Sequence, residues 1–190
     1  MPRPGLSINR ILPSDTKAFR LLWNTEHVPR DLLEIGDRRL RTYVSMGLVK
    51  QCVNTKNESV IMCTSKGRDY ISKLPDFAGR SPYISSSACN HNCELAKVYT
   101  ALPEEQQKQW VTEREILNMC RDRLDDIYQQ DFGRWLDLTE KEMSPCDGGV
   151  MNLEGRLEVM YEIITDNYGN LDSKEVCGQI LETNIEYTRV

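Results

Sequence analysis

The chain lacks the long apolar runs and the glycine-rich loops that define several large protein classes. No stretch approaches the roughly 18 to 20 apolar residues that span a bilayer, and the charges of the opening "MPRPGLSINR" have no apolar block behind them. Neither a G-x-x-x-x-G-K-[ST] loop nor a dinucleotide-binding glycine pattern is present. We therefore expect a cytoplasmic protein with no membrane partner, and we set the P-loop and dinucleotide-binding classes aside.

Histidine is scarce, and the cysteines show no regular pattern. His27 and His91 lie in segments where neither histidine has a serine or cysteine nucleophile as a partner. The seven cysteines are odd in number and scattered, which is typical of reduced thiols rather than disulfides. The stretch "CNHNC" places Cys89, His91 and Cys93 at alternate positions, but no second pair of zinc ligands accompanies them. We expect no zinc site, and interpret His91 as a helix-start residue that hydrogen-bonds locally.

Composition and charge indicate two parts of opposite sign. An apolar content of 39% and a charged content of 28% are typical of a globular protein. Residues 1–80 contain 14 Lys/Arg and 8 Asp/Glu, a net charge of +6, whereas residues 81–190 contain 10 and 21, a net charge of −11. The stretch "LPDFAGRSPYISSSACN" interrupts the periodic pattern between them. The sequence predicts two domains, 1–80 and 81–190.

The first domain has the element order of a winged helix-turn-helix. Apolar spacing predicts helices over 15–25, 28–36 and 37–49, then a β-hairpin of strands 50–54 and 59–64, then a helix over 64–74. The buried stripe of the third helix is expected to consist of Leu40, Tyr43, Val44 and Leu48.

In such a domain the third helix enters the major groove of DNA and the hairpin lies along the phosphate backbone. The third helix carries an excess of arginine on the face away from its apolar stripe, so double-stranded DNA is the expected partner. A solvated face or a protein-interaction module are the alternatives. The candidate DNA-binding residues are Arg38, Arg39, Arg41, Ser45, Lys50 and Lys56.

The middle segment predicts a helix from His91 onward and a second helix with a capping box made by Thr112 and Glu115. Trp110 is expected to anchor the core between helices. The order of a winged helix, "HNCELAKVY", "WVTEREIL", "CDGGVM" and "YEIIT" resembles the replication-relaxation family and its relatives on Gram-positive plasmids, conjugative elements and phages. The resemblance runs from about residue 15 to 181. It implies a DNA-binding accessory protein of replication or conjugative mobilisation.

The C-terminal part predicts strands over 148–153 and 156–165, a helix starting at 172 or 173, and a final strand over 185–190. This order resembles the minimal core of a restriction-endonuclease-like fold, so the expected fold class is α+β, with a winged helix-turn-helix followed by a small endonuclease-like domain. Asp147 and Glu162 are spaced like the acidic pair of such nucleases, which hold a divalent metal. Ile164 occupies the position where the catalytic lysine belongs, which predicts a degenerate site.

A lysine supplied by the following helix is the alternative to a degenerate site. Lys174 would then complete a catalytic set with Asp147 and Glu162, which would bind Mg²⁺ or Mn²⁺. The net charge of −11 disfavours a phosphate backbone there. We therefore expect a non-enzymatic protein of a mobile element that needs no cofactor, with the C-terminal domain contacting a relaxase, a replication protein or itself as a homodimer. The alternatives are a metal-dependent nuclease, a transcriptional regulator and a protein-interaction module.

Overall fold

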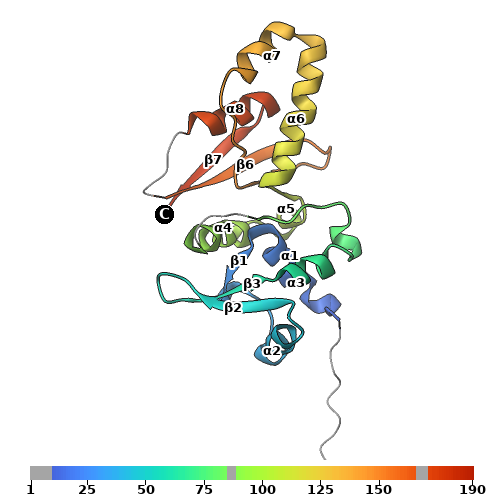
Figure 1. The fold of residues 1–190 in the computed structure, drawn as a ribbon, viewed down its shortest axis with the longest axis vertical. Coiled ribbons are helices and arrows are strands. Elements are labelled where there is room, and N and C mark those ends of the chain that lie inside the picture. The colour runs from blue at the N-terminus through green and yellow to red at the C-terminus, as the bar shows by residue number, and fades with distance from the viewer. Residues whose placement is uncertain (1–9, 85–88, 166–170) are drawn as a thin grey trace, which may run out of the picture.

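The computed structural model describes residues 10–84, 89–165 and 171–190 and shows a mixed α+β protein with two β-sheets (Figure 1). The first sheet has the strand order β1-β3-β2. Both pairs of neighbouring strands are antiparallel, and β2 and β3 form a hairpin. Thr64 caps α3 by accepting a hydrogen bond from the amide of Gly67. The elements of this part are α1 (Thr16–Thr25), β1 (His27–Pro29), α2 (Asp37–Ser45), β2 (Val49–Val53), β3 (Ser59–Cys63) and α3 (Ser65–Ile71).

The prediction of a helix over residues 28–36 is wrong. Its residues form β1 and a single 3₁₀ turn, Arg30–Leu32. Leu33 and Ile35 are both buried, so this stretch follows a period of two, and the Arg30 guanidinium donates to their carbonyl oxygens. The extended backbone therefore satisfies its polar groups through a side chain instead of through helical hydrogen bonds.

The buried stripe predicted for the third helix is confirmed at Leu40 and Tyr43, whereas Leu48 lies beyond the end of the helix. Leu40, Tyr43 and Leu48 are buried, whereas Val44 is 41% exposed. The helix ends at Ser45, and a turn with Gly47 at φ +71° follows it. Only one narrow face of so short a helix meets the core, and Val44 lies beside that face.

The second sheet has the order β4-β5-β6-β7. The β5–β6 hairpin is antiparallel, and α8 carries the chain back so that β7 pairs with β6 in parallel. The predicted strands, α8 and the Thr112–Glu115 capping box are confirmed, whereas β4 was not predicted. The elements are α4 (Cys89–Ala101), α5 (Glu104–Lys108), β4 (Trp110–Thr112), α6 (Glu113–Gln130), α7 (Phe132–Thr139), β5 (Gly148–Met151), β6 (Leu157–Ile164), α8 (Asp172–Leu181) and β7 (Asn184–Arg189).

Two cores cover the two faces of the second sheet. On one face, Tyr161 and Ile163 of β6 belong to the same cluster as Tyr99 of α4. On the other face, Met160 of β6 clusters with Cys120 of α6 and residues of α8. Figure 1 shows α4 on the side of this sheet toward the first sheet, with α6 and α8 on the other side. The sheet is therefore the middle layer of three.

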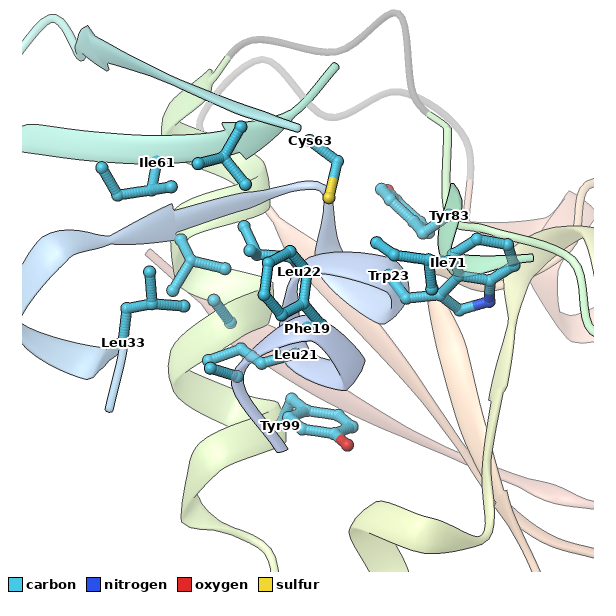
Figure 2. Close-up of a cluster of buried hydrophobic side chains, with 14 of the residues drawn as sticks. Phe19, Leu21, Leu22, Trp23, Leu33, Ile61, Cys63, Ile71, Tyr83 and Tyr99 are labelled. Carbon is cyan, nitrogen blue, oxygen red and sulfur yellow. The ribbon is translucent and has the colours of Figure 1, made fainter. Parts of the chain in front are cut away.

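The larger core runs without interruption from the first sheet to the second. Figure 2 shows α1 at its centre, with Phe19 and Leu22 among aliphatic side chains, and Tyr83 beside Trp23 and Ile71. Trp110 continues this core toward the second sheet, because it is fully buried and stacks on Tyr161 at 5.6 Å. Trp110 is thus a core anchor as predicted, although it lies on a strand. The described part of the chain contains no helix long and apolar enough to cross a membrane.

Candidate functional site

A buried hydrogen-bonded ion pair fixes the inner face of α2. Asp15 is fully buried, accepts a hydrogen bond of 2.8 Å from the Tyr43 hydroxyl and lies 3.0 Å from the Arg39 guanidinium. Burial raises the pKa of Tyr43 to about 12, so its hydroxyl stays protonated and donates. Of the six candidate DNA-binding residues, Arg39 therefore compensates a buried carboxylate instead of facing solvent freely.

The outer face of α2 carries free cationic charge. Arg38, Arg41 and Ser45 are exposed, and neither arginine makes an ion pair within the described residues. Lys50 is exposed on β2 and likewise has no acidic partner in the described part of the chain. Figure 1 shows α2 at the opposite end of the molecule from α6 and α7. Four of the six candidates are thus exposed and without an ion pair in the described residues, and we refer to them together as the α2 surface: Arg38, Arg41 and Ser45 on α2, and Lys50 on β2.

The tip of the β2–β3 hairpin rests on α4. Lys56 lies 3.4 Å from the Glu94 carboxylate, and Asn90 donates a hydrogen bond to the Thr55 hydroxyl. Lys56 is 57% exposed at its side chain, so the pair is weak, yet the lysine points toward an acidic partner. We therefore leave Lys56 and Arg39 out of the α2 surface.

The second candidate site lies where β5 and β6 meet helices α4 and α8. Asp147, which precedes β5, is 6% exposed and is held by three donors. Its carboxylate accepts hydrogen bonds from the Tyr83 hydroxyl at 3.1 Å and from the Ile163 amide at 2.8 Å. The Nε2 atom of His91 lies 3.1 Å from the same carboxylate. The local role predicted for His91 is confirmed, because it lies in the first turn of α4 and its Nδ1 atom is 3.2 Å from the Asn92 side-chain oxygen, but the contact of its Nε2 atom with Asp147 was not predicted.

Glu162 and Lys174 complete this cluster. The Lys174 ammonium lies 3.0 Å from Glu162 Oε1 and donates to the Pro145 carbonyl, while the Asp147 amide donates to Glu162 Oε2 at 3.1 Å. Lys174 and Glu162 are 10% and 1% exposed at their side chains. The fold thus brings Asp147, Glu162 and Lys174 together, whereas Ile164 is a buried apolar residue and contributes no polar group to the cluster.

The buried acid cluster, defined as His91, Asp147, Glu162 and Lys174, retains protons. Desolvation and the neighbouring Asp147 charge raise the pKa of Glu162 to about 7. Although burial opposes it, the hydrogen bond and charge of Asp147 raise the pKa of His91. The carboxylates likewise raise the pKa of Lys174 against its desolvation. All three pKa shifts favour protonation, which reduces the net negative charge that two adjacent carboxylates would otherwise place in the interior.

The acid cluster does not fit a divalent cation as it is arranged. Oxygen ligands are what Mg²⁺ or Mn²⁺ would require, but all four carboxylate oxygens of Asp147 and Glu162 already accept from, or pair with, protein groups. Within the described residues no three His, Cys, Asp or Glu side chains are grouped to hold a metal. The arrangement is instead a tie between β5, β6, α4 and α8.

Stability should depend on pH through this cluster. The pKa of Glu162 is about 7 in the folded state against an ordinary 4.5, and that of His91 is raised above 6.5, so the folded state binds more protons than the unfolded state between about pH 4.5 and 7. We therefore expect the free energy of unfolding to fall as pH rises through this window, by about 3 kcal/mol from Glu162 alone. Urea unfolding at pH 5.5 and 8 measures the change. The Glu162→Gln variant should show a smaller pH dependence, and an equal dependence would contradict the assignment.

Comparisons with models of known families, with curated proteins and with solved structures give no match for this chain. What the protein does must therefore be inferred from its own residues and contacts. Two features carry chemical information: the exposed cations of the α2 surface and the buried acid cluster.

Proposed function

We propose that the protein is a non-enzymatic DNA-binding accessory factor whose N-terminal part is a winged helix. The supporting observation is the exposed pair Arg38 and Arg41 on α2, which no carboxylate in the described part of the chain neutralises. The order α1, β1, α2, β2, β3 and the sheet order β1-β3-β2 support a winged helix in which β1 and a 3₁₀ turn replace the middle helix predicted over 28–36, with α2 as the helix that meets the major groove.

Arginine on this face suits the chemistry of a DNA contact. A guanidinium donates two parallel hydrogen bonds to a phosphate or to the acceptor edge of guanine. Ser45, one turn from Arg41, adds a hydroxyl, and Lys50 on β2 adds a point charge for a phosphate. Asp15 holds α2 rigidly from behind through Tyr43 and Arg39. The cations are therefore displayed on a fixed element, which reduces the entropy lost on binding.

The acidic C-terminal part supplies a surface for a protein partner. At the end of the α6–α7 hairpin, Tyr128 and Phe132 are 49% and 54% exposed and lie edge to face at 5.7 Å, with Trp135 packed against both. Exposed aromatic groups of this kind are typical of protein interaction sites. In the proposed mechanism the α2 surface marks a DNA site on a mobile element, and this hairpin recruits a relaxase, a replication protein or a second copy of the chain.

The acid cluster gives the nuclease alternative its only specific support in the described structure, because Asp147, Glu162 and Lys174 do meet. Their mutual hydrogen bonds favour a structural role. Incubation of supercoiled DNA with Mg²⁺ or Mn²⁺ separates the two functions: we expect no cleavage. Cleavage that disappears in a Glu162→Ala variant with unchanged folding would establish the nuclease instead.

Replacing both Arg38 and Arg41 with alanine should weaken DNA binding at least about tenfold at low salt, because each lost phosphate contact removes favourable counterion release. Gel retardation of a duplex fragment measures the loss. A matched control replaces Lys17 and Lys73, two lysines of the same domain that pair with Glu34 and Asp69. We expect the control to change affinity less than about threefold. Equal losses in both variants would show that binding is not located on α2.

A further inference from the structure

The charges of the C-terminal part are unevenly neutralised. Residues 81–190 contain ten lysines and arginines, and seven of them make ion pairs with carboxylates. Arg114, Arg121 and Arg189 make none within the described residues. Two of these three, Arg114 and Arg121, line one cavity of about 510 Å³. Free cations are therefore concentrated at one place in a part of the chain whose net charge is −11.

This cavity lies between the segment 80–84 and the N-terminal half of α6, and we call it the arginine cavity. Arg80 lines it as well, fixed by a 2.7 Å ion pair with Glu115. Arg114 and Arg121 are exposed and stand seven residues apart on α6, which places them about 10 Å apart along the helix axis and on nearly the same face. A span of this length suits a row of anionic groups better than a single small anion.

The arginine cavity and the acid cluster share a neighbour, Pro145. Pro145 lines the cavity, and its carbonyl oxygen accepts a hydrogen bond from the Lys174 ammonium of the cluster. Glu113 also lines the cavity, and desolvation raises the pKa of its carboxyl group. The lining therefore presents two guanidinium groups without an ion pair in the described residues, those of Arg114 and Arg121, and one carboxyl group whose charge is disfavoured, while the Arg80 guanidinium is neutralised by Glu115.

We infer that the arginine cavity binds the phosphodiester backbone of a nucleic-acid strand. Paired, planar guanidinium groups are suited to phosphate, and the preorganised fork of arginine loses less rotamer freedom for each hydrogen bond it forms than lysine does. This inference rests on the proposed function, since the α2 surface brings DNA to the molecule and raises its local concentration at a second site. The site is separate from the α2 surface, because its residues belong to the segment after α3 and to α6.

The test compares two double variants in one binding assay with a labelled oligonucleotide, either single-stranded or duplex, at low salt. Replacing Arg114 and Arg121 with glutamine should weaken binding of one of the two forms about tenfold. The control replaces Arg156 and Arg189 with glutamine, which removes the same charge from exposed positions outside the cavity. It should change affinity less than about threefold. Equal effects of the two double variants would overturn the inference, since only the net charge would then matter.

Two further arms separate the outcomes. If Arg38→Ala with Arg41→Ala weakens binding but Arg114→Gln with Arg121→Gln does not, the arginine cavity is refuted and the proposed function stands. If only the second pair weakens binding, the cavity stands and the α2 surface fails. Polyglutamate and inorganic phosphate serve as competitors. Displacement of the oligonucleotide by either at equal charge concentration would overturn the inference in favour of a general anion or acidic-peptide site.

Discussion

Replacing Lys174 with methionine should lower the free energy of unfolding by about 3 to 5 kcal/mol. Methionine fills a similar volume, so the loss comes from charge: Glu162, 1% exposed, would keep only the Asp147 amide as a donor while facing the Asp147 carboxylate. Removing one partner of a buried ion pair leaves an uncompensated charge, which costs this much. Urea unfolding at pH 8, above the pKa of about 7 that Glu162 has beside Lys174 in the wild-type protein, measures the effect.

Two comparisons isolate the cause. Lys141 pairs with Asp137 one helical turn away, but both side chains are exposed, so Lys141→Met should cost about 0.5 kcal/mol or less. Adding Glu162→Leu to Lys174→Met should restore part of the lost stability, because the unpaired charge disappears. If Lys174→Met proves as mild as Lys141→Met, the cluster is not a structural tie.

The second large effect is expected at Gly148, whose replacement by alanine should destabilise the fold by about 3 kcal/mol. A methyl group there would lie 2.0 Å from the Trp110 ring. That ring has no room to yield, because it is fully buried between Tyr99 at 5.3 Å and Tyr161 at 5.6 Å. Overpacking a rigid core costs this amount through shifted side chains and backbone.

Gly133→Ala is the matched control for Gly148→Ala. An added methyl group there would meet only the Asp131 side chain, at 3.5 Å, and Gly133 lies in the first turn of α7. Because alanine favours helix, the change should be neutral or stabilise by up to about 1 kcal/mol. Thermal unfolding of both variants compares them. A Gly148→Ala variant as stable as Gly133→Ala would mean that Trp110 is not packed against β5.

Local patterns predicted most elements, and long-range pairing explains the failures. The strands 50–54 and 59–64 flank a polar loop able to close a hairpin, and the helix starting at 172 has acidic residues in its first turn, so local residues were enough to predict these elements. The stretch 28–36 contains proline, leucines and an isoleucine that suit a helix or an extended segment equally. Its pairing with β3 decided the outcome, and no local residue announces that pairing.

The sequence likewise predicted only some members of the two candidate sites. Asp147, Glu162 and Lys174 were found because each lies at a recognisable place beside a strand or helix start. Tyr83 and His91 were missed as members of the cluster, because only the packing of α4 and the segment 80–84 on the second sheet brings them to Asp147. Arg39 and Lys56 looked like free cations, since their partners Asp15 and Glu94 lie far along the chain.

The salt dependence of DNA affinity tests the proposed function most directly. The logarithm of the association constant should fall linearly with the logarithm of salt concentration for the wild-type protein, and the slope counts the phosphates that its cations neutralise. For Arg38→Ala with Arg41→Ala, the slope should become shallower by about two units, one for each lost phosphate contact. A slope identical to that of the wild-type protein would contradict the assignment of DNA binding to α2.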